Sequence, residues 1–333
     1  MKKILEKLFI NPISILYNYL KFDAGNFPKK VQIETTNACN ARCLMCPLKI
    51  MQRSVGYMEM GLFKKIIDEI SHQKLRRLIL HIMGEPLLHP QIFEMVKYIK
   101  QKNPKQEVEF STNASLLDTK MSEKVIESGL DIINLSVDAS TKEVYEKVRI
   151  NLDYDTTMIN IRRFLELLEK SEGKKPLAKI QLIKLPENQN EWENFRKEWE
   201  EFAKNRSYIN LYIKEMGDWA GYLKKERSRG KNFYIKACCD APFDSLDIFW
   251  NGDCSFCCLD YDGKLLVGNV KNKSIKEIWK GNKINAYRDK FIKNKYSNIP
   301  LCSMCENAPR TWNVSFNLKK IIKKIIKKAI IRK

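Results

Sequence analysis

Apolar and polar residues alternate along this chain with two periods, one typical of strands and one typical of helices. Six short apolar runs predict β-strands near residues 31–35, 78–83, 108–111, 132–137, 178–185 and 209–213. Between these runs, apolar residues recur with helical spacing and predict helices near residues 60–72, 90–102, 118–128, 155–170 and 190–204. The strand–helix repeat predicts an α/β fold whose parallel sheet is either open or curled toward a barrel.

The alternation stops near residue 215, and the composition of the chain changes there. Residues 215–231 are polar and contain three glycines, so we expect a loop. Seven cysteines follow between Cys238 and Cys305, in a region with few long periodic segments. The pattern predicts four parts, which are an N-terminal helical extension (1–27), an α/β core (28–215), a small cysteine-rich domain with its linker (216–312) and a tail (313–333).

The composition is that of a soluble globular protein with a basic balance. Hydrophobic residues make up 44% and charged residues 30% of the 333 positions, which leaves ample apolar sequence for a core. The formal net charge is +20, and the last fifteen positions hold eight lysines and arginines and no acidic residue. This balance weakly favours anionic partners but does not establish nucleic-acid binding, so nucleic acid is not an expected partner.

The C-terminal tail has the pattern of a basic amphipathic helix. Its apolar residues form one stripe at helical spacing, and lysines fill the opposite face. The stripe consists of Leu318, Ile321, Ile322, Ile325, Ile326, Ala329 and Ile330. Such a helix is typical of reversible, peripheral contact with an anionic membrane surface. The alternative is that the stripe packs against the protein itself or a partner.

The N-terminal residues do not have the pattern of a signal peptide. Polar residues such as Glu6, Asn11 and Pro12 interrupt the apolar run, and no small-residue cleavage site follows. No stretch reaches the ~18 apolar residues of a membrane-spanning helix. We therefore expect a cytoplasmic protein, in peripheral contact with the inner face of the membrane if the tail binds there. In a reducing compartment, clustered cysteines are more often metal ligands than disulfides.

Three cysteines, Cys39, Cys43 and Cys46, follow the first predicted strand with the spacing C-x3-C-x2-C. This spacing places three soft thiolates on one tight loop, as a cubane iron–sulfur cluster requires. Three protein ligands leave one iron open, so the loop favours chemistry on a bound small molecule. In parallel α/β folds such chemistry gathers at the carboxyl ends of the strands, where this loop lies. Zinc is the alternative, although a zinc site usually takes four ligands.

Three further segments follow later strands in order. Gly84-Glu85-Pro86 follows the second strand, residues 111–117 follow the third, and residues 135–139 with Tyr145 and Arg149 follow the fourth. Together with the cysteine triplet, these segments resemble the radical S-adenosylmethionine (SAM) superfamily. The resemblance implies a partial (β/α)6 TIM-like barrel, a 4Fe-4S cluster on the triplet, and SAM bound to the open iron.

The resemblance also implies which residues contact SAM. These are Met45, Gly84, Glu85, Asn113, Ser136, Asp138 and Arg149. Gly84 and Glu85 would meet the methionine ammonium, and Arg149 would pair with the carboxylate as a forked donor. The alternative for Asp138 and Arg149 is a plain surface ion pair. The chain departs from the family at Met45, where an aromatic residue is common, and at Ala114, where glycine is usual.

The cysteine-rich region resembles the SPASM-type domain found behind many radical SAM cores. Asn251-Gly252, a strong hairpin signal, lies between its first cysteines and a Cys-Cys pair. The resemblance implies a second, auxiliary 4Fe-4S cluster held by Cys239, Cys257, Cys302 and Cys305. Cys238, Cys254 and Cys258 are left over, and the choice within each Cys-Cys pair stays open. Structural zinc is the alternative for this closed set of four thiolates.

Some polar and aromatic side chains near the predicted site have simpler interpretations. His81 and His89 lie near a strand end and are expected to be hydrogen-bonded structural residues rather than ligands. Trp219, Tyr222 and Phe233 are expected to be packing residues, with a substrate entrance as the alternative.

By resemblance, the function is reductive cleavage of SAM to a 5′-deoxyadenosyl radical that takes hydrogen from a substrate. We expect an external electron donor such as flavodoxin or ferredoxin, and an auxiliary cluster that relays an electron or positions substrate. A sugar-like metabolite is favoured over a peptide, because about 27 residues before the first strand are too few for a leader-binding module. The alternatives are a peptide- or protein-modifying maturase and, from another class, a non-enzymatic metal-binding scaffold.

Overall fold

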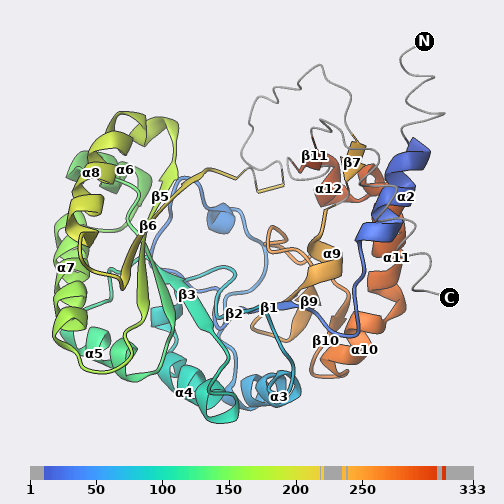
Figure 1. Cartoon of the computed structure of the whole chain (residues 1–333), viewed down its shortest axis with the longest axis horizontal. Coiled ribbons are helices and arrows are strands. Elements are labelled where there is room, and N and C mark those ends of the chain that lie inside the picture. The colour runs from blue at the N-terminus through green and yellow to red at the C-terminus, as the bar shows by residue number, and fades with distance from the viewer. Residues whose placement is uncertain (1–10, 218, 221–234, 238, 306–309, 313–333) are drawn as a thin grey trace.

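A computed structural model describes residues 11–217, 219–220, 235–237, 239–305 and 310–312 of the chain. Within these residues, a nine-stranded sheet has the order β10-β9-β8-β1-β2-β3-β4-β5-β6 (Figure 1). Its first six strands run parallel in chain order and are β1 (Lys30–Ile33), β2 (Arg77–Ile79), β3 (Val108–Thr112), β4 (Ile132–Ser136), β5 (Leu177–Lys184) and β6 (Ile209–Glu215). The predicted α/β fold with a parallel sheet is therefore confirmed.

Helices cover the outer face of this sheet (Figure 1). They are α3 (Met60–Ile70), α4 (Ile92–Lys102), α5 (Thr119–Glu127), α6 (Lys142–Val148), α7 (Tyr154–Lys170) and α8 (Trp192–Ala203). The periodicity predicted five of them and missed α6, because seven residues are too few to show a helical repeat. Short 3-10 turns add η2 (Pro47–Lys49), η3 (Pro86–Leu88), η4 (Pro186–Glu191) and η5 (Tyr296–Asn298).

The two faces of the sheet differ in polarity. Outward-facing residues such as Phe110 and Leu135 belong to the hydrophobic core under the helices. Their neighbours along the strands alternate to the inner face, and there they are polar, as at Glu109, Asn134 and Gln181. Parallel strands buried on both faces usually read as continuous apolar runs. The alternation in this chain therefore makes the barrel interior polar.

The cysteine-rich region continues the sheet of the core. Strand β8 (Ser245–Ile248) pairs in parallel with β1, so that Asp247 lies beside Gln32. Strands β9 (Asp253–Ser255) and β10 (Gly268–Asn269) follow in antiparallel pairs. The region thus shares one sheet with the six parallel strands.

The remaining elements gather at the far end of the molecule from α5 and α7 (Figure 1). They are α9 (Ala241–Asp244), α10 (Ile275–Lys280), α11 (Asn282–Ile292), α12 (Pro300–Met304) and the pair β7 (Ile235–Ala237) with β11 (Arg310–Trp312). Helix α2 (Asn11–Lys21) lies beside α11, where the buried Asn18 donates to Asn294 Oδ1 at 3.1 Å. The predicted N-terminal extension is therefore helical over residues 11–21.

No helix among the described ranges is both long enough and apolar enough to span a bilayer. The predicted amphipathic tail, residues 313–333, lies outside the described residues.

Candidate active site

A cavity of about 190 Å³ opens at the carboxyl ends of the parallel strands. All three triplet cysteines line it, and so do most of the residues that the sequence predicted to contact SAM. These lining residues are Cys39, Cys43, Met45, Cys46, Gly84, Glu85, Asn113, Ser136 and Arg149. Asp138 is not in the lining but holds Arg149. Trp219 also lines the cavity, whereas Tyr222 and Phe233 lie outside the described residues.

The cysteine loop is held by the short helix α6. Arg42 N donates to Ile150 O at 2.9 Å, and Leu44 N donates to Val148 O at 3.0 Å. Alternate residues of the loop are buried against this helix in a small apolar cluster of their own. Burial raises the pKa of Cys39 to about 12 and that of Cys46 to about 11. The metal-free thiols are therefore protonated at neutral pH, and metal binding must displace their protons.

Arg149 lies at the end of α6 and reaches the cysteine loop. Its Nη1 donates to Cys43 Sγ at 3.4 Å, and its Nη2 forms an ion pair with the fully buried carboxylate of Asp138. The other oxygen of Asp138 accepts from Ile183 N at 2.6 Å. The pair is thus buried, and the surface alternative is wrong. Arg149 Nε has no hydrogen-bond partner within the described part of the chain.

Gly84 brings the turn after β2 against the cysteine loop. Its φ is +85°, and a Cβ at this position would lie 2.4 Å from Thr36 O and 2.8 Å from Ala38 O. Only glycine fits such a close approach of two backbones. The next residue continues the contact, because Glu85 N donates to Ala38 O at 2.8 Å.

The carboxylate of Glu85 is bonded to the protein itself. It accepts from Thr112 Oγ1 and Asn113 N, both at 2.7 Å, and from Leu87 N at 3.1 Å. Glu85 is 2% exposed, and burial raises the pKa of its carboxyl group. Its visible role is to tie the end of β2 to the end of β3.

Asn113 belongs to a network that closes the next part of the rim. Its Nδ2 donates to Asn40 Oδ1 at 2.9 Å, and its Oδ1 accepts from Ser115 Oγ at 2.7 Å. Ala114 has φ 60°, which explains why glycine is usual there. Asn160 of α7 donates to Ser115 O at 2.9 Å and supports this strained turn.

Neutral hydrogen-bonding side chains line part of the cavity, namely His81, Ser111, Ser136 and Gln181. The sequence predicted Ser136 as a SAM contact and His81 as a hydrogen-bonded structural residue, but it did not single out Ser111 and Gln181. Ser111 N donates to His81 Nδ1 at 3.1 Å, and burial lowers the pKa of His81 to about 4, so its ring is neutral. The period-two alternation of polar residues along β3 to β5 was the signal that could have found them.

The structure separates the cysteines of the C-terminal region. Burial raises the pKa of Cys302 to about 12, and the neighbouring thiols of Cys239 and Cys305 add to the rise. Cys239 is also a charged neighbour of Cys257. Cys258 instead has Asp247, Lys30 and Gln32 as neighbours, on the β1–β8 seam. Cys254 is fully buried, and Cys238 lies outside the described residues.

Single-ion sites are not formed by the described side chains. No three histidine, cysteine or acidic groups among them stand close enough to hold one metal ion. In a cubane cluster each iron takes one protein thiolate, so the ligands do not converge on one atom. The soft, all-cysteine donor sets of both regions fit iron–sulfur clusters.

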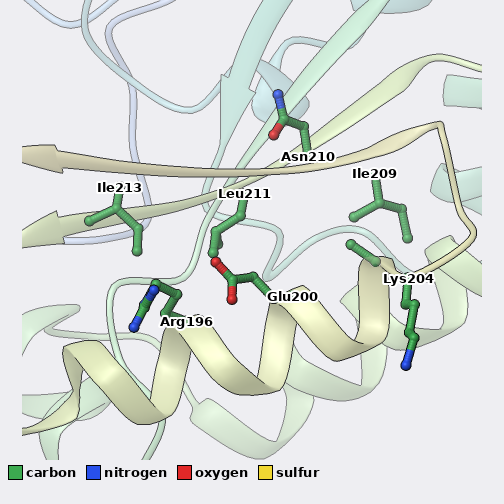
Figure 2. A pocket seen from close by; sticks show the side chains of 8 residues that line it. Arg196, Glu200, Lys204, Ile209, Asn210, Leu211 and Ile213 are labelled. Carbon is green, nitrogen blue, oxygen red and sulfur yellow. The ribbon is translucent and has the colours of Figure 1, made fainter.

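A second hollow of about 480 Å³ lies between α8 and the outer face of β6 (Figure 2). Ile209, Leu211 and Ile213 point from the strand toward the helix, while Asn210 points away. No cysteine lines it, and its side chains continue the packing between strand and helix. The candidate site is therefore the cavity with the cysteine loop.

Comparisons with known proteins agree with this site. A family model described as the radical SAM superfamily matches residues 33–198, and a model of an iron–sulfur cluster-binding domain, SPASM, matches residues 238–306. The chain belongs to the radical SAM superfamily. These two domains imply 4Fe-4S clusters and SAM as its cofactors.

Curated radical SAM relatives match different shares of the chain. A cofactor-modifying protein for tungsten-containing aldehyde ferredoxin oxidoreductase from Pyrococcus furiosus is 27% identical over 161 residues, 48% of this chain and 45% of the relative. A SAM-dependent 2-deoxy-scyllo-inosamine dehydrogenase from Niallia circulans is 20% identical over 280 residues, 84% of this chain and 92% of the relative. The chain spans about half or less of the length of the first curated relatives it matches.

Solved radical SAM structures share the fold. BtrN in complex with AdoMet and 2-DOIA superposes with a TM-score of 0.55 at 18% identity, covering 84% of this chain and 93% of that one. SuiB from Streptococcus suis, bound to its precursor peptide SuiA, gives a TM-score of 0.58 at 15% identity, covering 84% and 70%. This similarity confirms the partial TIM-barrel core.

Proposed function

We propose that this radical SAM protein cleaves SAM reductively and uses the 5′-deoxyadenosyl radical to take hydrogen from a small, polar, hydroxyl-bearing metabolite. The observation that carries the proposal is that one cavity holds the three triplet cysteines, the Gly84–Glu85 turn and Arg149. These groups come from three different parts of the chain. Their convergence at the carboxyl ends of the strands is what a SAM-binding cluster site requires.

The chain's own residues suit the proposed cofactors. Cys39, Cys43 and Cys46 would hold the cluster. Arg149 Nε, which has no partner among the described residues, is a buried donor suited to the SAM carboxylate. Backbone groups at Gly84 would meet the ammonium, and Met45, Asn113 and Ser136 would border the nucleoside. When bound, the cluster and SAM supply the radical chemistry, while the protein binds, orients and excludes water.

The ion pair of Asp138 and Arg149 fixes charge beside the cysteine loop. Because Asp138 is fully buried and bonded to Ile183 N, it holds the guanidinium in one orientation. Arg149 Nη1 donates to Cys43 Sγ at 3.4 Å, so the same side chain also holds a cysteine of the proposed cluster site in place. Arg149 therefore supports cluster binding as well as SAM binding in this proposal.

Two observations support a small polar substrate. The inner wall of the cavity consists of neutral donors and acceptors, namely His81, Ser111, Ser136 and Gln181, which suit hydroxyl groups. The Niallia circulans relative, which this chain matches over 92% of its length, is named as a dehydrogenase of 2-deoxy-scyllo-inosamine. A peptide is the second candidate, supported by the structural similarity to SuiB bound to its precursor peptide.

The auxiliary cluster would be held by Cys239, Cys257, Cys302 and Cys305. Cys258, the next residue after Cys257, has Gln32 of β1 and Asp247 of β8 as neighbours. The proposed auxiliary site therefore adjoins the barrel. In this proposal the second cluster takes or relays an electron, or positions substrate. An external donor such as flavodoxin or ferredoxin supplies the first electron, and the protein works in the cytoplasm.

Anaerobic reconstitution with iron and sulfide, followed by SAM and a reductant, tests the proposal. We expect 5′-deoxyadenosine from the wild type and none from Cys43→Ala. Cys258→Ala is the matched control, because it removes a thiol from outside both proposed ligand sets. A fully reconstituted wild type that forms no 5′-deoxyadenosine would instead support the metal-binding scaffold.

A further inference from the structure

Residues 51–58, which we call the return loop, follow the cysteine loop in the sequence. They run back beside residues 35–37, which lie between β1 and the cysteine loop. Met58 N donates to Thr35 O at 2.8 Å, and Thr36 and Tyr57 form an isolated antiparallel bridge. Asn37 closes the contact twice, by donating to Ser54 O and accepting from Gly56 N, both at 2.9 Å. The return loop and the start of the cysteine loop therefore form one unit.

Arg53 of the return loop joins this unit to the C-terminal region. Its two terminal nitrogens donate to the two oxygens of Glu34 at 2.8 and 2.7 Å, and its Nε donates to Tyr261 O at 2.7 Å. The guanidinium also lies 4.0 Å from the ring centroid of Phe249. Glu34 is fully buried and the Arg53 side chain is 12% exposed, so solvent barely screens the pair.

Two neighbouring contacts follow the same path. Gln52 N donates to Asp262 Oδ1 at 2.7 Å, and Trp250 Nε1 donates to Ser54 O at 3.2 Å. Trp250 packs so closely on Gly56 that a Cβ there would lie 2.5 Å from the indole ring. The bonds of Arg53 and Gln52 end at Tyr261 and Asp262. These residues follow shortly after Cys257, a proposed ligand of the auxiliary cluster.

We propose that Arg53 is a positioning residue that fixes the loop of Cys257 relative to the loop of Cys39, Cys43 and Cys46. The Arg53 side chain bonds Glu34, directly after β1, and lies over the ring of Phe249, directly after β8. It also bonds the backbone carbonyl of Tyr261, four residues after Cys257. The consequence for the two clusters rests on the proposed function, because it requires that both cysteine sets hold iron. In that state Arg53 sets the separation and orientation of the two clusters.

Arginine is specifically suited to this position. Its planar fork bonds both oxygens of Glu34 while Nε points to a third acceptor, which a lysine ammonium cannot reproduce. A buried pair of this kind adds little net stability compared with apolar packing, but it selects one geometry. The buried ion pair of Arg53 and Glu34 therefore lies where it fixes the orientation of two loops relative to each other.

Hydrogen–deuterium exchange on the metal-free protein tests the positioning role without any cofactor. We expect amides of residues 51–57 and 256–262 to exchange at least about tenfold faster in Arg53→Lys and Glu34→Gln, with α7 and α11 unchanged. Arg76→Lys is the matched control, because the ion pair of Arg76 with Asp244 also joins the core to the C-terminal region, away from both cysteine loops. Unchanged exchange, or faster exchange spread over all elements, would overturn the proposal.

Pulsed electron paramagnetic resonance on reconstituted, reduced protein tests the consequence for the clusters. The distribution of magnetic coupling between the two clusters should broaden in Arg53→Lys and stay narrow in Arg76→Lys. An unchanged distribution in Arg53→Lys would contradict the proposal. Failure of the proposed function would give a different result. The reconstituted wild type would then form no 5′-deoxyadenosine, while the metal-free Arg53→Lys protein would still show faster exchange in residues 51–57 and 256–262.

Discussion

Gly84 and Ala114 show how backbone conformation constrains individual residues around the site. Gly84 brings two chain segments within contact at a positive φ, and Ala114 adopts a left-handed φ of 60° with a side chain. The first position excludes any side chain, because backbone oxygens occupy the space. The second tolerates alanine at a cost of about 1 kcal/mol, which hydrogen bonds from Asn160 offset.

Replacement of Gly84 by alanine should lower the free energy of unfolding by about 2–4 kcal/mol, because the new Cβ would collide with Thr36 O. Urea unfolding of the metal-free protein, followed by tryptophan fluorescence, measures the change. Gly61→Ala is the matched control, since nothing lies within 4 Å of its Cβ position in α3. That variant should gain about 0.5–1 kcal/mol, and equal effects of the two substitutions would contradict the argument.

Asp247 gives the protein a pH dependence of known sign. It is fully buried, Gln32 bonds one oxygen at 2.6 Å, and the other oxygen has no partner among the described residues. Burial raises its pKa to about 6, above the ~3.9 of an unfolded chain. The folded state therefore keeps a proton that the unfolded state releases. The stabilising contribution is complete below about pH 4 and is lost as the pH rises through 6.

Asp247→Asn cannot ionise, so its stability relative to the wild type should rise by about 3 kcal/mol between roughly pH 4 and pH 7. Urea unfolding of both metal-free proteins across this range measures the difference. A difference that does not vary with pH would show that Asp247 titrates normally.

Among the elements, the short helix α6 has the largest effect on the site. It carries Arg149 at its end, and the residues at and after its end accept backbone hydrogen bonds from the cysteine loop. Strand β8 has a comparable role on the other side, because its parallel pairing with β1 brings the hairpin of Cys254 and Cys257 beside the barrel. The cysteine triplet thus follows β1 itself, whereas Cys254 and Cys257 belong to the hairpin that follows the neighbouring strand β8.

The cysteine pair after β9 offers a direct test of the auxiliary ligands. Cys257→Ala should lose the iron of one cluster after reconstitution, because Cys239 is among the neighbours of its thiol, as is Cys258. Cys258→Ala should keep that iron, because the other neighbours of its thiol are Asp247, Lys30 and Gln32 of the β1–β8 seam rather than a second proposed ligand. Iron analysis and the electron paramagnetic resonance signal of the second cluster measure both outcomes. Equal iron loss in the two variants would reject the assignment.

At the scale of the whole molecule, one sheet joins the parallel barrel to the cysteine-rich region, and α2 packs against α11 at its far end (Figure 1). The outer face is apolar and covered by helices, whereas the inner face is polar and opens at the cysteine loop. This division of polarity allows a hydroxylated substrate to lie between the two cysteine sets in the proposed function.

The basic tail predicts a property of the full chain. Removal of residues 314–333 should reduce co-sedimentation with anionic vesicles and leave sedimentation with neutral vesicles unchanged. Each lysine near an anionic surface contributes on the order of 1 kcal/mol, so added salt should weaken the binding of the full-length protein. Identical sedimentation of the two proteins with anionic vesicles would dismiss membrane contact.

The sequence by itself determined the six parallel strands, five of the six helices that cover them, and the fold class. The strands of the core lie within a few residues of their predicted positions. Each strand has apolar residues on its outer face and turn residues at its ends, and both features are visible in the sequence. The triplet spacing is a local feature, so its chemistry can be read from neighbouring residues. The Gly-Glu-Pro turn and Arg149 were singled out by their order along the chain and the resemblance to the radical SAM superfamily.

Only the tertiary structure decided which side chains meet. The carboxylate of Glu85 bonds groups from the next strand. Arg53 bonds Glu34, 19 residues away in the sequence, and Tyr261, 208 residues away. The neighbours of Cys258 include Gln32 of β1 and Asp247 of β8, two strands that are distant in the sequence. Local spacing does not encode these contacts, because they arise from pairing and packing between elements that are distant in sequence.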